Sequence, residues 1–125
     1  MDARYKCLPA DLKGLTVLDM GGYQGDLALA ALNRGAKRAV VADNKQWRIY
    51  GWPEPAVYPD VEYLEGDVFT WQEPFDVVLF YNVLYHLKSP WLALERLRAI
   101  TKQLLCLQTR IVLIEEPVLR LYSPL

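Results

Sequence analysis

The segment from Thr16 to Asn44 constrains the fold more than any other part of the chain. It begins with the apolar run 16–20, which is typical of a strand that is buried on both faces. A turn with three glycines follows, and helix-forming residues then occupy positions 26–34. A second apolar strand, 38–42, ends at Asp43. This order of strand, glycine turn, helix and strand predicts half of a nucleotide-binding unit.

The rest of the chain continues the alternation of apolar strands with helices or loops. Ser89 and Pro90 predict the start of a helix that extends to Lys102. Further strands are predicted at 61–64, 75–80 and 104–109. Weaker patterns indicate an arm or short helix at 1–13, a short helix at 44–50, and β-like runs at 111–114 and 117–122. We therefore expect an α/β fold, a Rossmann-like three-layer sandwich with a mostly parallel sheet of about five to six strands.

Composition narrows the class of protein. The chain has 125 residues, of which 53% are apolar, and this suits one domain over residues 1–125. A net charge of −1 gives no case for a strongly basic nucleic-acid surface, although a local patch is not excluded. The distant cysteines Cys7 and Cys106 predict reduced thiols in a cytoplasmic protein and no metal site. No apolar run reaches ~18 residues, so neither an export signal nor a membrane span is expected.

Acidic residues lie at or just after the carboxyl ends of the predicted strands, where parallel sheets bind their ligands. Asp19 lies two positions before Gly21, where a carboxylate would repel a pyrophosphate but would suit an ammonium group. At Asp43 a carboxylate can accept both hydroxyls of a ribose, and Asp67 can accept from the exocyclic amine of adenine. Together the three acids predict S-adenosylmethionine as the ligand. Taken singly, each acid could instead be a solvated loop residue or a helix cap.

These motifs resemble those of the class I S-adenosylmethionine-dependent methyltransferases. The branch that modifies uridine at the wobble position of tRNA is the most similar, and the resemblance extends over about residues 8–109. In the first half of the chain it rests on VLDMG (17–21) with the glycines up to Gly25, on GA (35–36) and on VVAD (40–43). In the second half it rests on FDVVLF (75–80), VLYHL (83–87), and SP (89–90) followed by LALERLR (92–98). The chain departs from the family in two ways. Tyr23 stands at a position that is commonly glycine, and the sequence is shortened at both ends relative to a seven-stranded enzyme.

The resemblance implies a role for each candidate residue. Asp19 and Gly21 would contact the methionine end of the cofactor, Asp43 would hold the ribose, and the remaining positions would shape the turn or read the adenine. The full set of expected cofactor-binding residues is Asp19, Gly21, Gly22, Tyr23, Gly25, Asp43, Asn44, Asp67, Val68 and Tyr81. The candidate catalytic residues are Tyr81 and Asn82, beside the sulfonium, and His86. His86 could act as a general base, although a lone histidine at a helix start is more often structural.

The predicted activity is transfer of a methyl group to a small molecule or an RNA base, with S-adenosylhomocysteine as the product. Methyl transfer to an activated acceptor can depend on alignment and desolvation alone. The alternative is a non-catalytic module or partner subunit that binds the cofactor. A nicotinamide-dependent oxidoreductase is a weaker alternative, because the glycine spacing and Asp19 are wrong for it. Because an open sheet edge exposes unpaired backbone, the C-terminal tail is expected to pair with a second copy in a homodimer.

Overall fold

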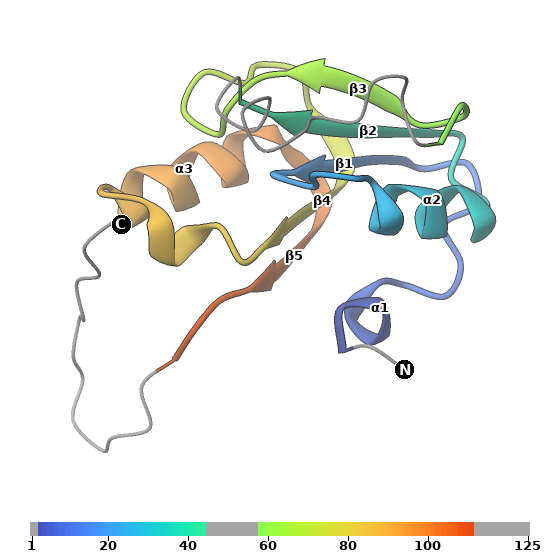
Figure 1. The fold of residues 1–125 in the computed structure, drawn as a ribbon, viewed down its shortest axis with the longest axis horizontal. Helices are drawn as coiled ribbons and strands as arrows, with labels where there is room; N and C mark the ends of the chain where they lie inside the picture. The colour runs from blue at the N-terminus through green and yellow to red at the C-terminus, as the bar shows by residue number, and fades with distance from the viewer. Residues whose placement is uncertain (1–2, 45–57, 112–125) are drawn as a thin grey trace.

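The computed structural model of the protein describes residues 3–44 and 58–111 (Figure 1). The strands form one five-stranded sheet in the order β3-β2-β1-β4-β5, and every neighbouring pair is parallel. The strands are β1 (Thr16–Met20), β2 (Arg38–Asp43), β3 (Glu62–Glu65), β4 (Phe75–Tyr81) and β5 (Thr101–Gln108). The helices are α1 (Ala3–Cys7), α2 (Asp26–Asn33), the short 3₁₀ helix η2 (Leu84–His86) and α3 (Pro90–Ile100). The predicted Rossmann-like α/β architecture is therefore confirmed.

The central strands are buried on both faces because their side chains are apolar at consecutive positions. Leu18 packs on one face of the sheet with residues of α3, including Leu97. Its neighbour Val17 packs on the opposite face with Leu27 and Ala31 of α2. Successive side chains of a strand point to opposite faces, so a continuous apolar run requires a cover on both sides. The described chain supplies these covers as the two outer layers of the sandwich.

The predicted element boundaries agree with the structure except near the start of β5. The helix predicted to reach Lys102 ends at Ile100, and β5 begins directly at Thr101 instead of residue 104. Thr101 takes an extended backbone, and its hydroxyl donates to the Leu97 carbonyl at 2.6 Å, which closes the last helical turn. Ser89 does occupy the N-cap position of α3, but its side chain makes no capping hydrogen bond.

Some predictions cannot be compared with the structure. The short helix predicted after Asn44 and the β-like runs predicted beyond Ile111 lie outside the described residues. Within the described ranges, no helix is long and apolar enough to cross a membrane.

The strand order places a topological switch point between β1 and β4. The chain runs outward from β1 to β2 and β3, and then returns to place β4 on the other side of β1. Parallel sheets bind ligands at such a point, outside the carboxyl ends of the strands. The loops that follow β1 and β4 meet there, since a Cβ added at Gly21 would lie 2.7 Å from Cγ2 of Val83.

Polar contacts join the starts of β1 and β4, at the end of the sheet opposite the cavity-forming loops. Asp76, near the start of β4, accepts hydrogen bonds through Oδ2 from the backbone N–H of Thr16 at 2.9 Å and from its hydroxyl at 3.1 Å. The backbone N–H of Asp76 donates in return to the Thr16 hydroxyl at 3.0 Å. These three bonds set the register of β1 against β4 at the end of the sheet that lies away from the switch point.

Candidate functional site

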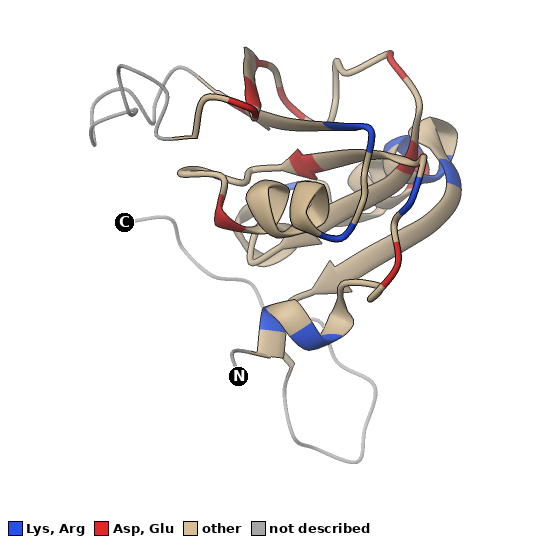
Figure 2. Ribbon diagram, turned by 90° about the vertical axis from the view of Figure 1, so that its right-hand side faces the viewer, with Lys and Arg blue, Asp and Glu red and all other residues tan. Residues whose placement is uncertain are grey.

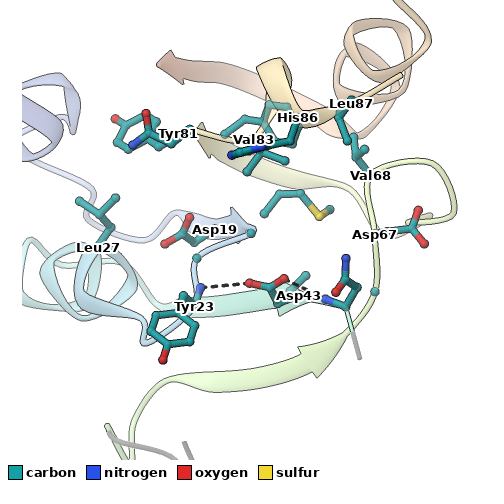
Figure 3. Close-up of a pocket in the computed structure, with 18 of the residues that line it drawn as sticks. Asp19, Tyr23, Leu27, Asp43, Asp67, Val68, Tyr81, Val83, His86 and Leu87 are labelled. Carbon is teal, nitrogen blue, oxygen red and sulfur yellow. Dashed lines mark hydrogen bonds between the residues drawn. The ribbon is translucent and has the colours of Figure 1, made fainter. Parts of the chain in front are cut away.

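A cavity of about 890 Å³ opens at the carboxyl ends of the strands (Figure 3). Its walls come from the loops after β1, β2, β3 and β4, and from α1. The predicted site residues that line it are Asp19, Gly21, Gly22, Tyr23, Asp43, Asn44, Asp67, Val68, Tyr81, Asn82 and His86. The topology therefore brings together residues that are separated by up to 67 positions in the sequence.

Gly25 is the one predicted site residue that is not among those lining the cavity. It precedes α2 with a φ of +92°, a conformation that glycine adopts without strain. A Cβ at this position would lie 2.8 Å from the hydroxyl oxygen of Tyr63. In this structure Gly25 therefore lets the glycine turn pack closely against β3.

Gly22 is required by the close approach of Asp19. A Cβ added at Gly22 would lie 2.3 Å from both Cγ and Oδ2 of the Asp19 carboxyl group. Real Cβ atoms essentially never come so close to another heavy atom, so any other residue at position 22 would displace the Asp19 carboxyl group. The turn also includes Tyr23, which has a φ of +50° although it carries a side chain. A strained residue of this kind is held by its surroundings, and a backbone bond to Asp43 provides part of that support.

Asp19 is a buried acid of the cavity with a strongly shifted pKa. It is only 2% exposed, and no residue of the described chain donates a hydrogen bond to its Oδ2 atom. Burial is the main cause that raises the pKa of Asp19 from 3.8 to about 7, and the nearby Asp43 charge raises it further. A buried carboxyl oxygen without a donor is costly for the protein alone. It becomes favourable when a ligand supplies a donor, and most of all a positively charged one.

Asp43 is also buried, but both of its oxygens have backbone partners. Its Oδ2 accepts from the N–H of Tyr23 at 3.2 Å, and its Oδ1 accepts from the N–H of Asn44 at 2.9 Å (Figure 3). The first bond joins the end of β2 to the glycine turn after β1. Asp43 therefore holds the turn in place and presents a carboxylate at the cavity wall.

Asp67 lies farther from the other two acids. Its Oδ1 accepts hydrogen bonds from the backbone N–H groups of Phe69 at 2.8 Å and Thr70 at 3.1 Å. The carboxyl group therefore caps the turn after β3, and Figure 3 shows it directed away from Asp19 and Asp43. The adjacent Val68 is 3% exposed and belongs to the hydrophobic core. Both residues nevertheless contribute to the cavity wall.

The end of β4 supplies the opposite wall. Tyr81 is 7% exposed, and burial raises the pKa of its hydroxyl above the ordinary value. Asn82 has a φ of +61°, and its N–H donates to the Gln108 carbonyl at 2.8 Å. His86 is exposed at the rim in η2, where its ring lies 4.2 Å from that of Tyr85. Its position at the rim is compatible with contact to an acceptor that enters from solvent.

The sequence analysis missed Arg4. This residue of α1 lines the cavity, and its positive charge opposes the rise in the pKa of Asp19. Figure 2 shows the basic residues of α1, Arg4 and Lys6, on the short helix at the N-terminal end of the described chain. Arg34 holds the segment in place, because its Nη1 atom donates to the carbonyls of Tyr5 at 3.2 Å and Leu8 at 2.5 Å. No local pattern near Arg4 indicates that α1 reaches the strand ends.

Among the residues that the structure describes, no group of three or more histidine, cysteine, aspartate and glutamate side chains could hold a metal ion.

Comparison with solved structures shows which proteins share this fold. The chain is similar to a Listeria monocytogenes protein described as an S-adenosylmethionine-dependent methyltransferase. The TM-score is 0.66, and the identity is 23% over 80% of this chain. Magnesium protoporphyrin IX methyltransferase from Synechocystis, solved with bound S-adenosylhomocysteine, has a TM-score of 0.57 and 20% identity over 73% of the chain. The [4+2]-cyclase SpnF has a TM-score of 0.59 and 19% identity over 81% of the chain.

These likenesses establish the fold. The chain covers only 48%, 44% and 39% of the three proteins, so it spans about half their length or less. No protein-family model matches the chain, and no curated protein sequence does. The chain thus shares the Rossmann-like fold of these methyltransferases over the part of their length that it covers. Since a cyclase shares the fold, the reaction has to be inferred from the site.

Proposed function

We propose that the chain binds S-adenosylmethionine at the carboxyl ends of its strands and transfers the methyl group to an acceptor. The observation that carries this proposal is the buried Asp19 carboxyl group, which lines the cavity and has an oxygen without a donor in the described structure. Similar solved structures support the choice of ligand, since one of them contains S-adenosylhomocysteine. S-adenosylmethionine supplies an electrophilic methyl group on a sulfonium.

The charges of the cavity fit the amino-acid end of this ligand. Asp19 would accept a hydrogen bond from the ammonium group, and Arg4 would place a positive charge near the carboxylate of the same end. Hydrogen bonds to charged groups are worth about 1.5–3 kcal/mol. The Asp19 carboxylate would repel a pyrophosphate, which argues against a dinucleotide in the same place.

The other walls fit the adenosine part. We assign the ribose to Asp43 with Asn44, because a carboxylate at the end of the second strand accepts ribose hydroxyls. Asp67 and the backbone of Val68 would lie against the adenine. The glycine turn from Gly21 to Gly25 would leave room for the methionine end, and Tyr23 would flank it.

Tyr81 and Asn82 are the residues that we place beside the sulfonium, because Tyr81 ends β4, Asn82 follows it, and β4 pairs with the strand that leads into the glycine turn. Their task would be to align the acceptor and to exclude water, which can supply much of the rate of methyl transfer. His86 at the rim would be able to take a proton from an acceptor. An acceptor that is already activated would need no general base, and the methyl transfer would then proceed without His86.

The acceptor would be a small molecule or an RNA base. The resemblance of VLYHL and the following helix to the wobble-uridine branch favours tRNA as the finer hypothesis. The second candidate function is a non-catalytic module or partner subunit that binds the cofactor. It stays a candidate because a [4+2]-cyclase shares the fold, so the fold alone does not determine a methyl-transfer reaction.

Calorimetric titration tests the binding proposal. S-adenosylmethionine and S-adenosylhomocysteine should bind, whereas NAD should not. Turnover with methyl-labelled S-adenosylmethionine, on total tRNA and on a panel of small acceptors, then separates the enzyme from the module. Binding without label transfer to any acceptor would favour the module, and binding of NAD alone would overturn both.

We also propose that two copies associate through the C-terminal tail. Within the described ranges β5 pairs only with β4, and its Leu104 and Leu107 side chains are each 41% exposed. An edge strand with exposed apolar side chains is a natural partner for a further strand. Light scattering that detects only a monomer at micromolar concentration would refute the dimer.

The two free thiols support a reducing compartment such as the cytoplasm.

A further inference from the structure

The two cysteines of the chain, 99 positions apart in sequence, lie in contact in the structure. Cys106 of β5 is 7% exposed, and its Sγ donates a hydrogen bond to the carbonyl oxygen of Cys7 at 3.5 Å. Cys7 ends the short helix α1 and is exposed to solvent. Both are free thiols. One thiol is therefore accessible to reagents, and the other lies directly beneath its backbone.

The contact places the Cys106 sulfur beside the residue to which a disulfide would join it. Bonded cysteines have Cα atoms about 4.4–6.8 Å apart, and the present contact already joins the Cys106 sulfur to the Cys7 backbone. Formation of the bond requires the Cys7 side chain to turn toward Cys106. No residue of α1 is buried, so the helix can adjust to this turn within the limit set by the Arg34 hydrogen bond to the Tyr5 carbonyl.

We propose that Cys7 and Cys106 form a reversible disulfide that fastens α1 to β5 under oxidising conditions. The oxidant is a small-molecule disulfide of the glutathione class. The Cys7 thiolate attacks one sulfur of oxidised glutathione, forms a mixed disulfide and releases one glutathione thiolate. Cys106, as the thiolate, then attacks the Cys7 sulfur and releases the second glutathione. The protein loses two electrons and two protons, and oxidised glutathione gains them as two thiols.

The order of the two attacks follows from burial. Cys7 is accessible, so it meets the glutathione first. Burial raises the pKa of the Cys106 thiol, which makes it a poor first nucleophile for a reagent in solvent. Once the mixed disulfide stands next to Cys106, proximity compensates for the small thiolate fraction.

The bond would also act on the candidate site, a consequence that rests on the proposed function. Arg4 lies one helical turn before Cys7 on α1 and lines the cavity. Fastening α1 to β5 would hold Arg4 at the methionine end and lower the entropy lost when the cofactor binds. The oxidised protein should therefore bind S-adenosylmethionine severalfold more tightly than the reduced protein.

The test is a titration of the purified chain with mixtures of reduced and oxidised glutathione, followed by alkylation in denaturant and intact-mass measurement. The expected oxidised product is monomeric, has lost two hydrogens and takes up no alkylating group. Its melting temperature should rise by about 5 °C or more, because the bond closes a loop of nearly the whole described chain. Dithiothreitol should reverse both changes.

Variants sharpen the result. Cys106→Ser and Cys106→Ala should each stop at a stable glutathione adduct on Cys7, and Cys7→Ser should leave Cys106 unmodified. A lasting glutathione adduct on the wild-type chain, or a disulfide between two chains, would overturn the proposal. The mass readout is independent of ligand binding. A disulfide without cofactor binding would count against the proposed function alone, and cofactor binding without a disulfide would count against the switch alone.

Discussion

Asp19→Asn should make the ligand-free protein more stable and the cofactor complex weaker. Asparagine has nearly the same shape, so it fits against Gly22, where even a Cβ would lie 2.3 Å from the carboxyl group. It removes the charge that is costly in the ligand-free site and useful in the complex. A purely structural acid would show a loss of stability instead.

The effect on stability can be worked from the pKa. A pKa raised from 3.8 to about 7 corresponds to about 4 kcal/mol in favour of the protonated form. Because the folded state binds the proton more tightly than the unfolded state, stability is greatest at low pH and is lost as the pH rises from about 4 to 7. Between pH 5 and pH 8 the wild-type loses about 3 kcal/mol through this group, and the asparagine variant loses none of it. The free energy of unfolding of the variant, relative to that of the wild-type, should therefore rise by about 3 kcal/mol from pH 5 to pH 8.

The effect on binding has the opposite sign. Loss of a charge-assisted hydrogen bond worth about 1.5–3 kcal/mol weakens binding by roughly 10- to 150-fold. Urea denaturation at pH 5 and pH 8 measures the first effect, and calorimetry with S-adenosylmethionine measures the second. The matched control is Asp60→Asn, which removes an exposed carboxylate outside the cavity and should change neither quantity. An Asp19→Asn protein with wild-type affinity, or with lower stability at pH 8, would refute the assignment.

Three further substitutions separate the site from its framework. Gly22→Ala would force the Asp19 carboxyl group to move and should weaken cofactor binding at least 10-fold in calorimetry, since a Cβ would lie 2.3 Å from Oδ2; wild-type affinity would mean that the position of Asp19 is not critical. Asp43→Asn removes the charge proposed for the ribose and one of the two oxygens that accept backbone N–H groups, and should weaken binding of S-adenosylmethionine about 10-fold, more than it weakens binding of free methionine; equal losses for both ligands would contradict the ribose role. Asp76→Ala removes the acceptor of two Thr16 hydrogen bonds far from the cavity, and should lower the free energy of unfolding by about 1–2 kcal/mol in urea titrations with little change in cofactor affinity. Since those bonds lower the pKa of Asp76, its contribution is present at neutral pH and lost in acid, opposite to that of Asp19, and a stability gap between Asp76→Ala and wild-type that persists at pH 2 would contradict this.

The fold was predictable where the sequence carries a local signal. The segment 16–43 combines two continuously apolar strands with a glycine turn, and such strands have few alternatives to a covered parallel sheet. The start of β5 was predicted late, because 101–103 is the polar sequence TKQ and carries no apolar signal. Residues 101–104 are half-buried or exposed at the sheet edge, and their pairing with β4 makes them a strand.

The site was predictable only in part, because some of its geometry is tertiary. Asp19 and Asp43 could be found from their places at the carboxyl ends of β1 and β2. Arg4 could not, because it reaches the cavity through the packing of α1 and the bonds from Arg34. The capping role of Asp67 was an open alternative in the sequence, and the positive φ of Asn82 depends on its bond to β5.

The most direct test of the central claim is calorimetric titration of the wild-type chain with S-adenosylmethionine, S-adenosylhomocysteine and NAD. Each of the two adenosyl amino acids should bind at one site per chain, and NAD should give no heat of binding. At 100 times its dissociation constant, either ligand should also stabilise the fold by about 2.7 kcal/mol. Binding of NAD alone, or of none of the three, would contradict the claim that Asp19 and its neighbours form an S-adenosylmethionine site.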